Sequence, residues 1–477
     1  MPLPTQALLF SDGAWREGAS TQPLHDKFDG AELAQVHVPD RAQVDQAVRA
    51  VAAAQASARQ TGYERGAVLM AASALMRERR DRLVDAVVAD TGFTLTDAGR
   101  EVERATETLQ LCGEEAKRVA GRMVPVEGGP GVRGRIGFTL RKPLGVVCAI
   151  TPFNAPVNTV CHKVGPALAA GNGIVLKPAP ETPLTAVLLV ELLLDAGVPQ
   201  GLVALLPGGA EVGQALLEHP VPAFYAFTGS TRVGEHIART VGIRRTQLEL
   251  GSLASTIVCA DAALEVAAGL CVNAAFRKAG QVCTSVQRLY VQREVMTEFG
   301  ALVARGVADR VVGDPRRPET FVGPVISPDA ADRIESWVTE AVEGGAELVH
   351  GGAREGSVIT PTILGNVSRD MTVMTNEVFG PVVVLRPFDT LAEAVAEAND
   401  TPFGLAAGVF TADLDSALTA AQQLRVGTVH INETSSSRVD LMPFGGVKAS
   451  GTGVEGPRYA IEEMTEETLV TVGPARP

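Results

Sequence analysis

The stretch GVVCAI, residues 145–150, is a glycine followed by a short run of apolar and β-branched residues, which predicts a buried strand. The helical pattern of 182–196, with Pro183 at its first turn, predicts a helix in the same region. Further strand-like runs lie at 172–176, 203–206 and 224–227. Strands that alternate with helices are typical of an α/β protein with a parallel sheet.

The segments on either side of this region extend the prediction. Ala-, Arg- and Leu-rich stretches with helical periodicity predict helices over 41–60, 64–90 and 101–119. A glycine-rich turn between β-prone runs predicts a hairpin over 122–141, and the stretch 467–472 predicts a further strand. Because exposed strand edges need to be covered, we expect these two elements to contact another subunit.

The composition of the chain excludes several classes of protein. The 477 residues, 46% of them hydrophobic, predict two or three domains. A net charge of −13 disfavours nucleic acid and anionic lipid as partners. The longest apolar run, 186–194, is too short to cross a bilayer and predicts a buried helix. Since no signal peptide is visible after Met1, we expect a cytoplasmic protein.

One of the six cysteines lies in a sequence context that favours chemistry. The other five lie in apolar stretches and are expected to pack as small core residues. No CxxC pair and no spacing to histidine indicates a metal site, so we expect no metal and no disulfide framework. Cys283 follows Gly280, which gives the backbone freedom to turn the thiol away from a helix predicted over 264–279. With Glu249 upstream as a base, the chain offers what thioester chemistry requires.

Seven short motifs at compatible spacings give this chemistry a family context. They are PFN at 152–154, KPA at 177–179, FTGST at 227–231, LELG at 248–251, GQVCT at 280–284, EVFGP at 377–381 and PFGGVK at 443–448. Their order resembles the aldehyde dehydrogenase superfamily over nearly the whole chain. The resemblance implies a non-acylating oxidoreductase that oxidises an aldehyde with NAD or NADP.

The resemblance also implies the catalytic residues. Cys283 attacks the aldehyde carbonyl and forms a thiohemiacetal. Asn154, together with the backbone N–H of the nucleophile, stabilises the oxyanion. Glu249 is the general base for the water that hydrolyses the thioester, and its leucine neighbours predict a half-buried carboxyl with a raised pKa.

Five residues match the cofactor contacts of the family. Lys177 is expected to reach the adenosine ribose, while Gly229 and Ser230 lie at a helix N-terminus that suits a pyrophosphate. Glu377 is expected to bind the nicotinamide ribose, with Phe379 beside the ring. The chain has proline at position 180, where NAD-specific members often have glutamate, so NADP is tolerated in principle, although we favour NAD.

Two positions that line the aldehyde tunnel in the family carry Arg277 and His162, and Arg438 lies in a nearby loop. Cationic and donor side chains that face one cavity favour an anionic tail. The sequence therefore predicts a short, polar, anionic aldehyde of the semialdehyde, phosphono- or sulfo-aldehyde type. A salt bridge at Arg277 and a satisfied hydrogen bond at His162 would account for the same residues without a substrate.

Other readings remain open at this point. The loop 432–451 also resembles lactaldehyde and glyceraldehyde-type dehydrogenases, which act on neutral hydroxyaldehydes. A CoA-acylating enzyme is disfavoured because such enzymes generally lack the deacylating glutamate. A binding protein that lost activity is disfavoured because Cys283, Glu249 and Asn154 are all present.

The expected architecture follows from the resemblance and from the alternation of strands and helices. We expect a Rossmann-type cofactor domain over 1–121 and 140–251 and an α/β catalytic domain over 252–448. The segments 122–139 and 464–477 are expected to form a small β oligomerisation element. We expect this element to hold together a homodimer or a homotetramer.

Overall fold

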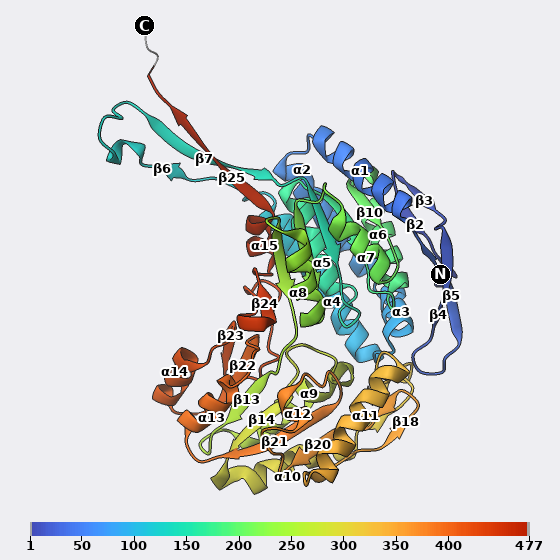
Figure 1. Ribbon diagram of the computed structural model, residues 1–477, viewed down its shortest axis with the longest axis vertical. Coiled ribbons are helices and arrows are strands. Elements are labelled where there is room, and N and C mark those ends of the chain that lie inside the picture. The colour runs from blue at the N-terminus through green and yellow to red at the C-terminus, as the bar shows by residue number, and fades with distance from the viewer. Residues whose placement is uncertain (1, 475–477) are drawn as a thin grey trace.

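The computed structural model describes residues 2–474, which form two α/β bodies and a projecting β arm (Figure 1). The first body is built on an eight-stranded sheet with the strand order β24-β12-β11-β8-β9-β10-β2-β3. Its parallel strands are β8 (Val146–Ile150), β9 (Gly173–Lys177), β10 (Val203–Leu205), β11 (Phe224–Thr228) and β12 (Arg245–Glu249). The antiparallel edges are β2 (Leu9–Ser11), β3 (Ala14–Arg16) and β24 (Gly451–Thr452).

Successive side chains of β8 point to opposite faces of the sheet, and because they are apolar on both faces, helices cover both. Val147 and Ala149 belong to one hydrophobic cluster, and Val146 and Cys148 belong to another. The helices that contribute to the first cluster are α2 (Gly62–Glu78), α3 (Arg80–Thr91), α4 (Leu95–Glu115), α5 (Asn158–Ala170), α6 (Pro183–Asp195) and α15 (Pro457–Glu463). The helices that contribute to the second are α1 (Arg41–Ser57), α7 (Ala210–Glu218) and α8 (Thr231–Val241).

The second body contains a seven-stranded sheet with the order β17-β20-β21-β14-β13-β22-β23. Its strands are β13 (Ser255–Val258), β14 (Arg288–Gln292), β17 (Glu347–His350), β20 (Thr362–Gly365), β21 (Val382–Phe388), β22 (Ala406–Phe410) and β23 (Thr428–Ile431). Its helices are α9 (Leu264–Phe276), α10 (Met296–Ala308), α11 (Pro328–Glu343), α12 (Thr372–Thr375), α13 (Leu391–Asn399) and α14 (Leu414–Gln423). Leu289 and Tyr290 on β14 pack into opposite clusters, so this sheet is also buried on both faces.

The arm is a three-stranded antiparallel sheet that extends away from both bodies (Figure 1). Its strands are β6 (Met123–Val124), β7 (Ile136–Pro143) and β25 (Thr465–Val472). Several apolar side chains on the arm are exposed, namely Met123, Ile136, Leu140, Leu469 and Val472. The hairpin and the C-terminal strand expected from the sequence therefore pair with each other, while the last expected residues, 475–477, lie outside the described part of the chain.

Smaller sheets complete the described structure. One contains β1 (Gln6–Ala7), β5 (Glu32–Val38) and β4 (Ser20–His25). Two others pair β15 (Val311–Val312) with β16 (Thr320–Val322), and β18 (Arg354–Glu355) with β19 (Val358–Ile359).

Within residues 2–474, every helix is too short or too polar to cross a bilayer. The same residues contain no group of three or more His, Cys, Asp or Glu side chains placed to hold a metal ion. All six cysteines are free, and all but Cys283 are buried.

Several helix predictions were wrong in their boundaries. The helix expected over 101–119 spans Leu95–Glu115 instead. The helix expected over 64–90 is split at Arg79, where α2 ends and α3 begins. The helix expected to run to residue 279 ends at Phe276, because Arg277 is extended and the next two residues take left-handed backbone angles. This early end turns the chain sharply just before Cys283.

Candidate active site

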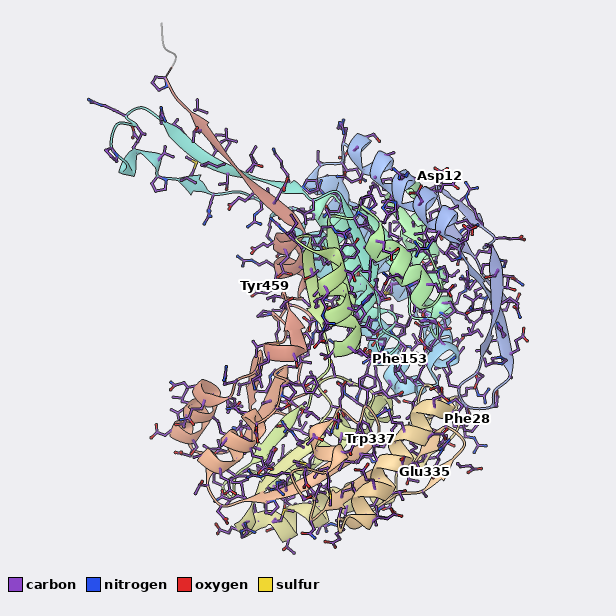
Figure 2. The ribbon with its side chains drawn as sticks, viewed as in Figure 1. Asp12, Phe28, Phe153, Glu335, Trp337 and Tyr459 are labelled. Carbon is purple, nitrogen blue, oxygen red and sulfur yellow. The ribbon has the colours of Figure 1, made fainter. Side chains whose placement is uncertain are left out.

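The two bodies meet where the parallel strands of the first sheet end. Phe153, after β8, packs edge-on against Phe379, before β21, with ring centroids 5.8 Å apart. Figure 2 places Phe153 between the two bodies. The neighbouring strands β9, β8, β11 and β12 all end at this edge, which is where ligands bind in open parallel sheets.

Cys283 lies in a loop that is shaped by a close backbone approach. Gly280 has φ +71°, and a Cβ at that position would lie 2.0 Å from the carbonyl oxygen of Gly380, so only glycine fits. Cys283 is partly exposed and lines a pocket together with Ser252, Glu377 and Phe379. The loop therefore presents the thiol to a small pocket that residues of the second body line.

The environment of Cys283 keeps its thiol protonated. Burial, followed by the nearby charges of Glu377 and Glu249, raises the pKa of the Cys283 thiol to about 12. A thiol with this pKa is a weak nucleophile at neutral pH. Any reaction through the Cys283 thiolate therefore requires a base to take this proton.

The carboxyl group of Glu249, the last residue of β12, is buried in surroundings that favour its protonated form. Its side chain is 3% exposed, and neither oxygen has a hydrogen-bond partner among residues 2–474. Burial, followed by the Glu455 charge, raises the pKa of Glu249 well above its usual value. A buried carboxyl with free lone pairs is suited to accept a proton from a reactant.

Asn154 is held against the loop that carries Cys283. Its side-chain Nδ2 donates to the carbonyl oxygen of Gln281, 2.8 Å away. Gln281 is itself fixed, because its Oε1 accepts from the backbone N–H of Ile326 at 2.9 Å. The structure thus brings the amide of Asn154 to within two residues of Cys283 along the chain.

The end of β11 and the start of α8 present polar groups suited to a dinucleotide. Ser230 is the N-cap residue of α8, but its side chain makes no capping hydrogen bond. The buried hydroxyls of Thr228 and of Thr151, at the end of β8, lack partners within residues 2–474. Unpaired buried hydroxyls and a helix N-terminus at one sheet edge fit a phosphate-bearing ligand.

Lys177 is the last residue of β9, and Glu377 precedes β21 in the second body. Burial lowers the pKa of Lys177 to about 8, while the nearby Glu181 carboxylate acts in the opposite direction. Glu377 accepts from the backbone N–H of Ser252 at 2.9 Å, and burial raises the pKa of Glu377 to about 7. A Cβ on Gly251 would lie 3.0 Å from the Glu377 carboxyl, so the glycine leaves room beside it.

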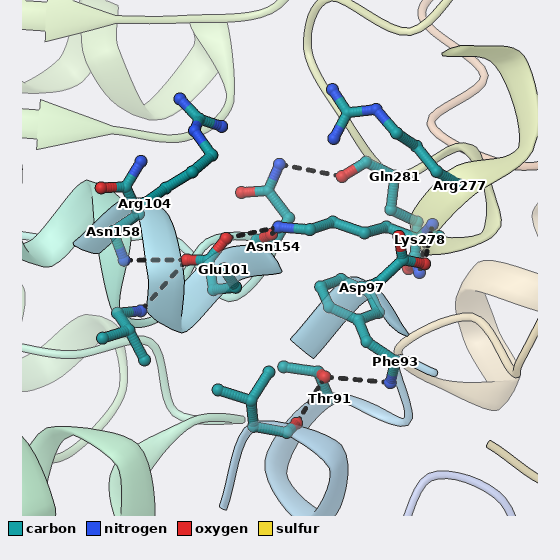
Figure 3. A network of polar contacts seen from close by, with 12 residues as sticks. Thr91, Phe93, Asp97, Glu101, Arg104, Asn154, Asn158, Arg277, Lys278 and Gln281 are labelled. Atoms are coloured by element: carbon teal, nitrogen blue, oxygen red, sulfur yellow. Dashed lines mark hydrogen bonds and ion pairs between the residues drawn. The ribbon is translucent and has the colours of Figure 1, made fainter. Parts of the chain in front are cut away.

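Arg277 has its guanidinium charge without a matching acid. Its terminal nitrogen donates to the hydroxyl of Ser436 at 2.7 Å, and within residues 2–474 no carboxylate lies within 4.0 Å of it. In Figure 3 the guanidinium groups of Arg104 and Arg277 extend to the same side of the network, beyond Asn154. Arg104 binds Asp440 through two hydrogen bonds, at 3.0 and 2.7 Å.

His162 and Arg438 are engaged by carboxylates. His162 is fully buried, and its Nε2 lies 2.9 Å from Asp440. Burial and the Arg438 charge lower the pKa of His162, while the contact with Asp440 acts in the opposite direction. Arg438 pairs with Glu455 at 3.0 Å. Of the three side chains expected from the sequence to face a substrate, only Arg277 has no carboxylate within 4.0 Å among residues 2–474.

Asp440 and Glu455 are the carboxylates that pair with the cationic and imidazole side chains near the pocket. Burial acts to raise the pKa of Asp440, but contacts with His162 and Arg104 hold it well below its usual range. Glu455 pairs with Lys163 at 2.9 Å as well as with Arg438. The single negative charge of Glu455 therefore faces the two positive charges of Lys163 and Arg438.

The sequence reasoning missed a polar stripe on α4. Four side chains of this helix face the site region, namely Asp97, Glu101, Arg104 and Thr108. Their spacing follows the helical repeat, and three of them are buried although polar. A row of polar residues at helical spacing was the signal in the sequence, but its partners lie far along the chain.

Comparisons with known proteins agree with this geometry. Residues 15–470 match the model of the aldehyde dehydrogenase family. A 3-sulfolactaldehyde dehydrogenase from Priestia megaterium is 46% identical over 97% of both chains, and a sulfoacetaldehyde dehydrogenase from Neptuniibacter caesariensis is 37% identical over 95% of this chain and 100% of its own. The crystal structure of aldehyde dehydrogenase 21 from Physcomitrella patens in complex with the reaction product succinate matches with a TM-score of 0.95, 34% identity and 98% coverage of both chains.

Proposed function

The chain belongs to the aldehyde dehydrogenase family, and we propose that it oxidises a short aldehyde with an anionic tail to the carboxylic acid. The observation that carries this proposal is the uncompensated guanidinium of Arg277 beside Arg104 in the pocket region of Cys283. Relatives that act on sulfonated aldehydes support the same class of substrate. We therefore expect a sulfo-aldehyde or semialdehyde as the substrate.

The proposed reaction uses three side chains in turn. Cys283 gives its proton to a water molecule, and the thiolate sulfur attacks the aldehyde carbon, which moves the π electrons of the carbonyl to its oxygen as a negative charge. The amide of Asn154 and the backbone N–H of Cys283 donate to that oxygen. After a hydride leaves the same carbon, the product is a thioester. Glu249 takes a proton from water, whose oxygen attacks the thioester and releases the acid and the free thiol.

The nicotinamide cofactor, NAD or NADP, supplies the hydride acceptor when it is bound. We assign its phosphates to the α8 N-terminus at Gly229 and Ser230, its adenosine ribose to Lys177 and its nicotinamide ribose to Glu377, with Phe379 beside the ring. Two of the hydroxyls without partners in residues 2–474 lie next to this set, since Thr228 precedes Gly229 and the backbone N–H of Thr151 donates to the carbonyl oxygen of Lys177 at 3.1 Å, which supports the fit. We propose the eight-stranded body, 1–121 and 140–251, as the cofactor domain and 252–448 as the catalytic domain.

NAD is the cofactor that we favour. Glu181 lies close enough to Lys177 to act on its pKa, so a negative charge already faces this lysine. A 2′-phosphate in the same place would meet that carboxylate at an energetic cost. An adenosine ribose with a free 2′-hydroxyl meets no such repulsion.

Replacement of Arg277 by glutamine tests the proposed substrate class. The variant is expected to lose about 10- to 100-fold in kcat/KM for sulfo-aldehydes and succinate semialdehyde, because one charge-assisted contact is worth about 1.5–3 kcal/mol. Alkyl aldehydes should change by less than about threefold. The measurement is steady-state kinetics with each aldehyde and with both cofactors.

Arg305→Gln, an exposed arginine on α10, is the matched control for loss of one positive charge. It should leave all the aldehydes unchanged. An equal loss for charged and neutral aldehydes in Arg277→Gln would contradict an anionic tail. A preference of the unmodified enzyme for lactaldehyde would favour the alternative, a neutral hydroxyaldehyde, which the Ser436 and Thr284 hydroxyls beside Arg277 could bind.

We propose that the arm joins copies of this chain into a homodimer or a homotetramer. Leu140 and Leu469 are 44% and 55% exposed on the paired strands β7 and β25, which supports a covered surface in an assembly. Changing both to glutamate should lower the mass measured by light scattering by at least half. Val266→Glu, an exposed apolar position on α9, is the control and should keep the mass of the unmodified protein. A monomeric unmodified protein at working concentration would contradict the assembly.

A further inference from the structure

A buried lysine lies between the two loops that carry Asn154 and Cys283. Lys278 is 7% exposed, and its Nζ donates to Glu101 Oε2 at 2.7 Å and to the carbonyl oxygen of Asn154 at 2.8 Å. Figure 3 shows its side chain running from the nucleophile loop to these two acceptors. One ammonium group therefore joins α4, the Asn154 loop and the Cys283 loop.

The backbone of Lys278 is fixed as firmly as its side chain. Its N–H donates to Asp97 Oδ2 at 2.7 Å. Its carbonyl oxygen accepts from the backbone N–H and from the side-chain Nε2 of Gln281, both at 3.1 Å. Gln281 in turn accepts from the amide of Asn154. Lys278 and Asn154 are thus connected twice, once by the direct bond from the Lys278 ammonium group and once through Gln281.

The conformation at Lys278 is one that the chain would not adopt without these contacts. Lys278 and Ala279 have φ values of 52°, and Gly280 has φ 71°. Left-handed angles cost about 1–2 kcal/mol for each non-glycine residue. Such angles persist only where the surroundings hold them, and they gather at functional sites. Asp97 and Glu101 are the groups that hold this turn.

Glu101 also fixes the other side of the Asn154 loop. Its Oε1 accepts from the backbone N–H groups of Asn158 and Val157, at 2.8 and 3.3 Å, at the start of α5. A carboxylate there satisfies free helix N–H groups and interacts favourably with the helix dipole. The Asn154 loop is therefore held at its carbonyl by Lys278 and at its following helix by Glu101.

We propose that Lys278, with Glu101 as its partner, is a positioning residue that sets the Asn154 amide relative to the Cys283 thiol. This inference rests on the roles proposed above for Asn154 and Cys283. A donor that is misplaced by about 1 Å stabilises a developing oxyanion poorly, at a cost of up to about 100-fold in rate. Substrate and cofactor binding use other residues and stay in place.

The test is Lys278→Met, which keeps an unbranched side chain and removes the ammonium group. We expect kcat to fall about 10- to 100-fold, with KM for aldehyde and cofactor changed by less than about threefold. Iodoacetamide should alkylate Cys283 at close to the unmodified rate, because displacement at carbon builds no oxyanion. Glu101→Gln should change kcat in the same direction.

Arg386→Met is the control, since it removes a partner of the buried Glu397 in the second body, away from the proposed machinery. It should lower the melting temperature and keep kcat. A folded Lys278→Met protein with unchanged kcat would overturn the proposal, and so would loss of alkylation in step with turnover. If the single variant does not fold, the charge-balanced pair Lys278→Met with Glu101→Gln is judged by the same criteria. Failure of the proposed function would appear separately, as no aldehyde oxidation by the unmodified enzyme.

Discussion

Replacement of Cys283 by serine is expected to lower the rate of aldehyde oxidation by about 1000-fold or more. The hydroxyl of serine is a far weaker acid and nucleophile than a thiol, and this site already disfavours ionisation. Burial and the charges of Glu377 and Glu249 raise the pKa of the Cys283 thiol to about 12. A serine at this position would meet the same burial and the same negative charges. The measurement is steady-state turnover, followed by reduced cofactor.

The control for this experiment is Cys259→Ser, which removes a buried thiol at the end of β13 in the same body. It should keep kcat within about threefold of the unmodified enzyme. Mass spectrometry after mild treatment with iodoacetamide should find the label on Cys283, the one partly exposed cysteine of the chain. Full turnover by Cys283→Ser, or by an enzyme fully alkylated at Cys283, would remove the covalent mechanism.

The alternation of strands and helices was readable from the sequence because it depends on local chemistry. Val147 and Ala149 face one layer of helices and Val146 and Cys148 the other, so every residue of the run is apolar. A continuous apolar run of this length, repeated between helical segments, predicts a buried parallel strand. The family membership predicted from the motifs is confirmed over residues 15–470.

The side-chain contacts around the pocket, by contrast, could not be predicted from the sequence. His162 is engaged by Asp440, which is 278 residues away, and Lys278 is engaged by Glu101, which is 177 residues away. Such pairs depend on how α4 and α5 pack against the second body, and no local pattern encodes that. For the same reason the sequence could name Arg277 and Arg438 as candidates but could not show that only Arg277 lacks an acidic partner.

The end of α9 shows how tertiary structure overrides local preference. The segment after Phe276 is compatible with further helix, and the sequence predicted one up to residue 279. The observed turn instead takes left-handed angles at Lys278 and Ala279, stabilised by Asp97 and Glu101 on α4. Sequence reasoning fails here at a point of strain that adjoins the proposed nucleophile, which is where strain is expected to serve function.

Replacement of Glu249 by glutamine is expected to lower steady-state turnover by about 100- to 1000-fold while one equivalent of cofactor is still reduced rapidly. Glutamine has nearly the same size as glutamate but cannot accept a proton from water. The thioester then forms and persists, because in the proposed reaction Glu249 acts only in its hydrolysis. Rapid-mixing kinetics should resolve a burst of reduced cofactor equal to the concentration of active sites. Loss of the burst together with the steady state would assign Glu249 to activation of the thiol instead.

The pH dependence of the unmodified enzyme follows from the same carboxyl group. A general base works in its ionised form, which is populated above its pKa. Because burial and the Glu455 charge raise the pKa of Glu249 well above its usual value, kcat should begin to fall at a correspondingly higher pH as the solution is acidified. The residual turnover of Glu249→Gln should lack this acid limb, since glutamine does not titrate. An acid limb of the same midpoint in both enzymes would show that another group controls hydrolysis.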